Sequence, residues 1–284
     1  MRISCVLRTM SATTPATVLR PTLERVEELR TSLAEISARV QQAAPANATT
    51  GRQPTLVAVS KYKPASDILA CYEDGQRDFG ENYVQELVDK AAQLPADIRW
   101  HFIGTFQTNK SKILASIPNL YAVQTVGSAK GADALNKQLT SRTTPLNVLL
   151  QVNTSGEDVK SGLAPLTSPV PADAELVHLA RHIVSSCPHL HLQGLMTIGS
   201  LTESLDSKEK PNEDFEKLKQ TRDLLEEALA PEKGQWGEGG RLLLSMGMSS
   251  DFEAALRTGS DIVRVGTGIF GGRPKKEEVK SATS

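Results

Sequence analysis

Eight short runs of branched and aromatic residues recur along the chain, and segments with helical periodicity separate them. Each run is typical of a buried strand. They lie at residues 56–60, 77–79, 99–103, 120–125, 146–152, 190–196, 241–245 and 261–265. The intervening segments place apolar residues three and four positions apart, as Val84, Leu87 and Val88 do. Strands that alternate with helices are expected to run parallel, because a crossover joins each strand to the next.

The number of runs decides between two α/β architectures. An open doubly wound sheet is one option, but eight strands at mostly about 20 to 25 residues per repeat match a closed barrel. We therefore predict an α/β fold, a single (β/α)8 barrel of the TIM type. Residues 22–44 add an amphipathic helix, introduced by Pro21. The barrel with this N-terminal helix is predicted to span residues 21–273, between a disordered or targeting-like tail at 1–20 and a polar tail at 274–284.

Composition excludes several classes of partner. With 32 lysines and arginines against 33 aspartates and glutamates, the net charge is −1, so we expect no nucleic-acid binding. No apolar run approaches the roughly 18 residues that span a bilayer, so we expect no membrane insertion. Three widely separated cysteines favour a reducing compartment, and we expect a cytoplasmic protein. The arginines, serines and threonines before Glu24, with no acidic residue among them, leave a mitochondrial transit peptide as the alternative.

Lys61 follows the first run and is the first candidate site residue. In a barrel the site lies at the carboxyl ends of the strands. Val57, Val59 and Lys61 share one parity along the strand, which predicts that the lysine points into the mouth of the barrel. Desolvation at an apolar rim favours the neutral amine, which attacks aldehydes. The alternative is a surface lysine that extends to solvent.

The segments after the last two runs indicate an anion site. Ser250 and Glu253 match a capping box that opens a short helix, and Ser249 adds a second hydroxyl donor. After the eighth run, Gly266 and Thr267 are small enough for backbone amides to approach a ligand closely. Barrels often bind phosphate after strands seven and eight. A lysine amine and a phosphate site at one rim together predict a phosphorylated aldehyde as the ligand.

Two further patterns are weaker. Residues 266–271 read GxGxxG, but no acidic residue follows at the spacing that a dinucleotide site needs. His178 and His182 are four apart but lack an HExxH pattern, so we expect surface histidines and no metal.

Several motifs together resemble those of the pyridoxal phosphate homeostasis proteins, relatives of the barrel half of alanine racemase. They are AVSKYKP, FGENYVQE, WHFIGTFQTNK, EDVKSGL, GLMTIG, LLSMGMSSDFEAAL and VRVGTGIFGGR, spread over about residues 54–273. The resemblance implies a closed barrel and a Schiff base between Lys61 and pyridoxal 5′-phosphate. It also implies that the two C-terminal loops hold the phosphate, through Ser249, Ser250, Gly266 and Thr267. By the same resemblance, Asn82 and Arg264 are expected at the cofactor ring.

The resemblance leaves the activity open. One hypothesis is a non-catalytic protein that stores pyridoxal phosphate and hands it to apo-enzymes; the absence of the second domain of the racemases favours it. An arginine at the ring nitrogen, expected of Arg264, would also keep the cofactor a weak electron sink. The alternative is an amino acid racemase or a related enzyme, with Tyr62, Tyr83 or His101 as a second acid or base. A third, an aldolase-type barrel, would use Lys61 on a sugar phosphate.

Overall fold

Eight parallel strands close into a barrel in the computed structural model, which describes residues 20–44, 53–157, 160–200, 211–232 and 234–272. Each strand pairs with its successor, and β8 pairs with β1. The strands are β1 (Thr55–Val59), β2 (Asp78–Glu81), β3 (Arg99–Phe102), β4 (Leu120–Val126), β5 (Leu146–Gln151), β6 (Leu190–Met196), β7 (Leu243–Ser245) and β8 (Ile262–Val265). This confirms the predicted (β/α)8 barrel. Both predicted tails, apart from Arg20, lie outside the described residues.

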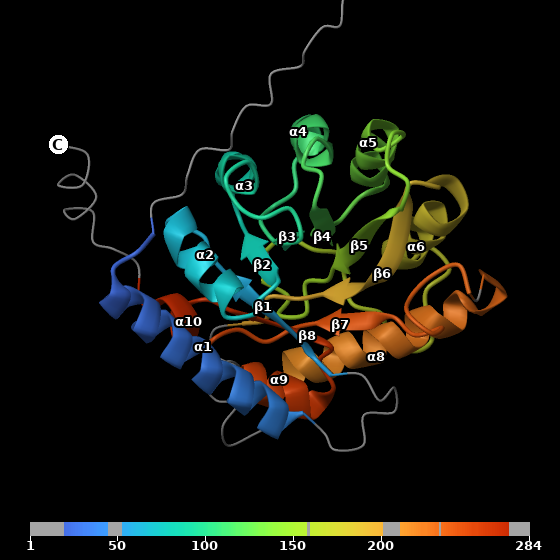
Figure 1. Cartoon of the computed structure of the whole chain (residues 1–284). Helices are drawn as coiled ribbons and strands as arrows, with labels where there is room; N and C mark the ends of the chain where they lie inside the picture. The colour runs from blue at the N-terminus through green and yellow to red at the C-terminus, as the bar shows by residue number, and fades with distance from the viewer. Residues whose placement is uncertain (1–19, 45–52, 158–159, 201–210, 233, 273–284) are drawn as a thin grey trace, which may run out of the picture.

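Helices surround the barrel (Figure 1). They are α1 (Leu23–Ala43), α2 (Ala65–Glu73), α3 (Val84–Ala91), α4 (Ser111–Ala115), α5 (Ala129–Gln138), α6 (Glu175–Ser186), α8 (Glu213–Ala228), α9 (Phe252–Thr258) and α10 (Thr267–Phe270), with 3-10 turns η1 (Thr108–Lys110) and η2 (Ala230–Glu232). No helix in the described ranges is long and apolar enough to cross a membrane.

The additional helix α1 covers the outside of the barrel where its first and last strands meet (Figure 1). The Thr22 hydroxyl caps it by accepting from the amide of Arg25 at 3.2 Å. Its buried residues, Leu29, Leu33, Ile36 and Val40, recur at helical spacing and pack against α2, α9 and α10. The Arg25 guanidinium donates to Asp67 at 2.8 Å and to the carbonyl of Phe270 at 2.9 Å. Helix α1 therefore links α2, which follows the first strand, to α10, which follows the last strand.

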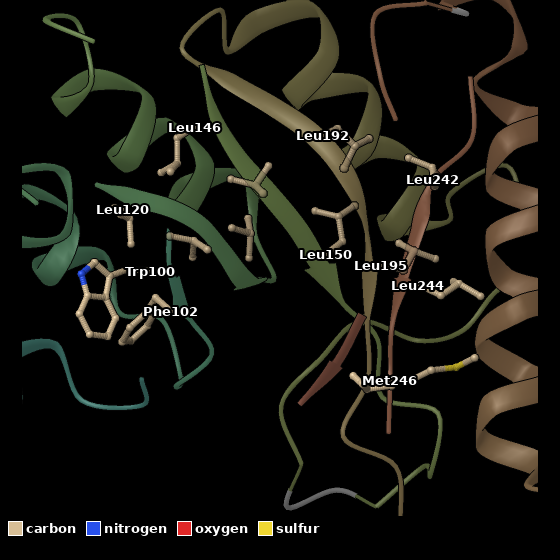
Figure 2. Close-up of a cluster of buried hydrophobic side chains, with 14 of the residues drawn as sticks. Trp100, Phe102, Leu120, Leu146, Leu150, Leu192, Leu195, Leu242, Leu244 and Met246 are labelled. Carbon is tan, nitrogen blue, oxygen red and sulfur yellow. The ribbon is translucent and has the colours of Figure 1, made fainter. Parts of the chain in front are cut away.

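The core has two layers. A small inner layer fills the barrel with one residue from each of six strands: Val57, Ala122, Leu149, Met196, Leu243 and Ile262. A larger outer layer lies between strands and helices, and Figure 2 shows part of it, from Trp100 and Phe102 to Leu244 and Met246. Because side chains alternate along a strand, the same strands supply both layers.

Two local predictions differ from the structure. The predicted capping box is wrong: α9 begins at Phe252, after Asp251, because Ser250 lies in the preceding turn and Asp251 accepts the amide of Met248 at 2.6 Å. The proline- and serine-rich composition of residues 163–173 predicts a surface loop, but the segment is partly buried. Leu163 and Leu166 belong to the core, and the amide of Leu166 donates to the hydroxyl of Thr221 at 3.2 Å. Leu166 holds the segment against α8, and Leu163 forms a bridge with Val152 after β5.

Candidate functional site

A cavity of about 600 Å³ opens at the carboxyl ends of the strands. Its walls come mainly from β1, β2, β7 and β8 and the loops that follow them. The structure brings all of the site residues predicted from sequence to this one cavity: Lys61, Asn82, Ser249, Ser250, Arg264, Gly266 and Thr267. Apolar side chains, among them Val59, Ile103 and Met196, also line it.

Two lysines face this cavity, and their amines differ in their partners. Lys63 Nζ donates to the carbonyls of Phe270 and Gly272, at 3.0 and 2.6 Å. Within the described residues, no hydrogen bond or ion pair engages Lys61 Nζ. Lys61 therefore offers an amine that is available for reaction, whereas that of Lys63 is held by the backbone.

A buried charged cluster supports the loop that carries Lys61. Lys90 Nζ donates to the carbonyl of Ser60 at 2.7 Å and to Glu81 and Glu86 at 2.6 Å each. The Ser60 hydroxyl donates to the same Glu81 carboxylate at 2.6 Å, and Glu86 accepts the amide of Tyr62 at 2.6 Å. The cluster thus holds the residue on each side of Lys61. Burial of Glu81 raises the pKa of its carboxyl to about 7, although Lys90 and Ser60 act in the opposite direction.

Sequence patterns alone do not reveal this cluster. Glu86 and Lys90 lie four residues apart on α3, a spacing that indicates a surface ion pair. Only the fold shows that α3 turns this pair inward toward Glu81 and Ser60.

Tyr62 has a left-handed backbone, with φ of 62°, which is costly for a residue with a large side chain. Its hydroxyl contacts that of Tyr83, and the two ring centroids are 5.1 Å apart. Both rings are about half exposed at the rim of the cavity. The residue that follows Lys61 therefore carries backbone strain at the cavity.

A second wall, formed by the loops after β7 and β8, is built from glycines and hydroxyls. Gly247 has φ of +93°, and a Cβ there would lie 2.6 Å from the Cβ of Ala255. The amide of Gly266 donates to the hydroxyl of Ser249 at 3.2 Å, which joins the loops after β7 and β8. A Cβ on Gly266 would lie 3.2 Å from the carbonyl oxygen of Val59. Glycine is therefore required for the first loop to pack against α9 and for the second to pack against β1.

Arg264 lies at the floor of the cavity and is 4% exposed. Its guanidinium donates to the Ser245 hydroxyl at 2.7 Å and to the carbonyl of Thr197 at 2.8 Å. Burial lowers the pKa of Arg264 to about 10, so the group stays protonated at neutral pH. Nearby, Asn82 Oδ1 is buried and has no hydrogen-bond partner among the described residues.

His101, considered as an acid or base from sequence, lies away from this cavity. It lines a second cavity of about 290 Å³ at the other mouth of the barrel, with Asp78 and Arg99, where the strands begin. His178 and His182 lie on α6, and His182 Nε2 is 2.7 Å from Asp133.

The sequence of this chain matches a protein-family model and several named proteins. A family model described as alanine racemase, N-terminal domain, matches residues 31–274. The chain is therefore a barrel of the alanine racemase N-terminal type. It is 42% identical to the pyridoxal phosphate homeostasis protein of Schizosaccharomyces pombe over 242 residues, 85% of this chain and 92% of that protein. It is 43% identical to the human protein of the same name over 228 residues, 78% of this chain and 77% of that one. The chain belongs to the pyridoxal phosphate homeostasis protein family.

A solved structure agrees with this assignment. PipY of Synechococcus elongatus PCC7942, solved with pyridoxal phosphate bound, is 29% identical and superposes with a TM-score of 0.64. The match covers 86% of this chain and all of PipY.

Proposed function

We propose that this protein binds pyridoxal 5′-phosphate at Lys61, holds it covalently and releases it to apo-enzymes, without turning over amino acids itself. The observation that carries the proposal is the meeting of an unengaged lysine amine, a hydroxyl-rich wall and a buried arginine in one cavity. Relatives named for pyridoxal phosphate homeostasis, and the PipY structure with the cofactor bound, support it.

The cavity residues fit the three chemical parts of this cofactor. Lys61 suits the aldehyde, because a neutral amine condenses with it reversibly. Ser249, Ser250 and Thr267 place hydroxyl donors on the wall that would face the phosphate. Val59, Ile103 and Met196 give the ring an apolar environment. Asn82 Oδ1, buried without a partner, is an acceptor that a polar group of the ligand would satisfy.

Arg264 is the residue that argues for storage over catalysis. When bound, pyridoxal phosphate supplies an aldehyde and an electron-withdrawing ring. The Arg264 guanidinium keeps its positive charge at the floor of the cavity. A positive charge there would disfavour protonation of a ring nitrogen placed next to it. It therefore limits the electron withdrawal that amino acid chemistry requires.

The candidate acids and bases point the same way. His101 lies at the other mouth of the barrel, and the hydroxyls of Tyr62 and Tyr83 contact each other at the exposed rim. An open rim suits exchange of the cofactor with an acceptor amine.

The direct test is cofactor attachment. The purified protein, supplied with pyridoxal phosphate, is expected to gain visible absorbance, and borohydride reduction followed by peptide mapping should place the label on Lys61. Lys63→Ala is the matched control, because Lys63 faces the same cavity with its amine engaged. Lys61→Ala should lose the reducible label and Lys63→Ala should keep it. A label that remains on Lys61→Ala would contradict the proposal.

Two further assays address release and catalysis. Transfer of cofactor from the loaded protein to an apo-enzyme should be faster than its dissociation into a trap. Racemisation, decarboxylation and transamination of amino acids should not exceed those of free pyridoxal phosphate. Enzyme-like turnover would favour the racemase alternative.

A further inference from the structure

A continuous chain of hydrogen bonds crosses the interior of the barrel, from the floor of the cofactor cavity to the opposite mouth. Arg264 donates to the Ser245 hydroxyl at 2.7 Å, and Ser245 donates to Gln124 Oε1 at 2.7 Å. Gln124 Nε2 lies 2.9 Å from His101 Nδ1, and His101 Nε2 lies 3.0 Å from Asp78 Oδ1. Four strands, β2, β3, β4 and β7, link Arg264 on β8 to the other end of the barrel.

With Oε1 of Gln124 placed toward Ser245 and Nε2 toward His101, the donors and acceptors give every bond in this chain a direction. A guanidinium can only donate, so the hydroxyl of Ser245 accepts from it and must donate to Gln124 Oε1. The amide nitrogen of Gln124 then faces His101 Nδ1, which has to accept. His101 consequently carries its proton on Nε2 and donates it to Asp78, whose carboxylate can only accept.

Burial protects the chain from competition with water. Gln124 and Ser245 are fully buried, and His101 is 1% exposed. Arg99 holds Asp78 from the other side through its Nε at 2.7 Å and a second, close contact. Burial alone would raise the pKa of Asp78, but the hydrogen bonds from His101 and Arg99 outweigh it and hold this pKa below its usual value. The acceptor end therefore keeps its negative charge at neutral pH.

We propose that His101 is a positioning residue for the cofactor: held by Asp78 as the Nε2–H tautomer, it orients Arg264 through Gln124 and Ser245. The inference rests on the proposed function, because it assigns the orientation of a group at the floor of the cofactor cavity. If the hydrogen bonds of Gln124 are removed, the Ser245 hydroxyl loses its acceptor and can rotate. The guanidinium of Arg264 then keeps its hydrogen bond to the Thr197 carbonyl but loses the directed one to Ser245, so that its orientation at the floor of the cavity is less fixed, although every residue that lines the cavity is unchanged.

Gln124→Met tests this directly. The substitution keeps the approximate volume but removes both the acceptor and the donor, and Gln124 does not line the cofactor cavity. We expect about a tenfold increase in the Kd for pyridoxal phosphate, the scale of one hydrogen bond to a charged group. We also expect a changed absorption maximum of the bound cofactor. Gln193→Met is the matched control: Gln193 is also a buried barrel glutamine, but it bonds Glu238 at the opposite mouth and lies outside the chain.

A pair of variants at His101 provides a second test that does not depend on the folding of Gln124→Met. His101→Gln can still accept from Gln124 and donate to Asp78, whereas His101→Leu can do neither. The glutamine variant should retain the spectrum and Kd of the wild type, and the leucine variant should show the changes expected of Gln124→Met. Thermal unfolding of the cofactor-free proteins separates loss of stability from loss of orientation.

The outcomes distinguish this inference from the proposed function. Wild-type protein that binds no pyridoxal phosphate would overturn both. Normal binding by wild type, with unchanged Kd and spectrum in folded Gln124→Met or with equal values for the two His101 variants, would overturn the inference alone.

Discussion

The two walls of the cofactor cavity are built on opposite principles. On the lysine side, after β1 and β2, the loop 60–63 rests on buried charged side chains, Glu81 and Lys90. On the hydroxyl side, after β7 and β8, no described ion pair lies within the loops 247–250 and 266–267, and glycines and a serine-to-amide hydrogen bond set their shape. A lysine on a flexible stem needs a fixed base if its amine is to stay in place. An anion site needs close backbone approach, which side chains would obstruct.

Removal of the positive charge of Lys90, on the Lys61 side of the cavity, should have the largest effect on stability. Lys90→Met leaves Glu81 buried beside Glu86 without its counter-charge, and we expect a loss of about 4 kcal/mol in the free energy of unfolding. Denaturant unfolding of the cofactor-free protein measures it. Lys112→Met, on α4 with no charged partner in the described ion pairs, is the surface control and should change stability by less than about 0.5 kcal/mol. Equal effects of the two substitutions would show that the cluster does not support the lysine side.

The pH dependence of the free energy of unfolding should also reveal the buried carboxyl of Glu81 on the Lys61 side. The folded-state pKa of Glu81, about 7, exceeds its unfolded value, so the folded protein binds more protons between about pH 4.5 and 7. The contribution of Glu81 to stability is therefore full below the unfolded pKa and is lost as pH rises to 7, by about 3 kcal/mol. Glu81→Gln should remove this slope. A wild-type minus variant difference that stays flat or rises over this range would contradict the assignment.

On the hydroxyl side, the sharpest test is a single methyl group. Gly247→Ala combines a left-handed backbone with a Cβ 2.6 Å from that of Ala255, whereas Gly75→Ala, with φ of +99°, has open space around it. We expect the first to cost about 2 kcal/mol more than the second, since both share the backbone penalty and only one adds overpacking. Thermal unfolding of the two variants measures the difference. Equal costs would mean that the turn after β7 adjusts without strain.

The smallest expected effect is that of the hydroxyl joining the two loops. Ser249→Ala removes the acceptor for the amide of Gly266 and one donor from the cavity. We expect the affinity for pyridoxal phosphate to fall about fivefold, or about 1 kcal/mol, with the reducible attachment at Lys61 intact. Titration by absorbance, with borohydride labelling in parallel, tests this. Loss of the attachment itself would mean that the two walls are not separable.

The same contrast explains what the sequence could predict. Periodicity and turn chemistry are local, and they located the eight strands to within about two residues, as well as α1. The parity of Val57, Val59 and Lys61 predicted a lysine at the mouth, and the seven predicted cofactor-binding residues all line the cavity there. Their contacts with the cofactor remain predictions.

What the sequence could not predict depends on tertiary contacts. The cluster under Lys61 joins residues from separate parts of the chain, Ser60, Glu81 and Lys90. The Glu86–Lys90 ion pair has helical spacing, and that spacing does not indicate whether the pair is buried. His101 was grouped with the tyrosines, but its partner Asp78 begins β2 and places it at the other mouth. The predicted capping box at Ser250 is wrong because the Asp251 carboxylate accepts the amide of Met248 and the helix begins only after Asp251. In each case a partner distant in sequence, or a competing neighbour, decides the outcome.

The pairing of β8 with β1 has a consequence for biosynthesis. Lys61 leaves the ribosome well before Arg264 and Phe270, whose carbonyl accepts from both Arg25 and Lys63. A nascent chain cannot assemble the complete cavity until these last elements have emerged from the exit tunnel. The lining residues therefore become available to a ligand together, once the segment that follows β8 has also left the tunnel.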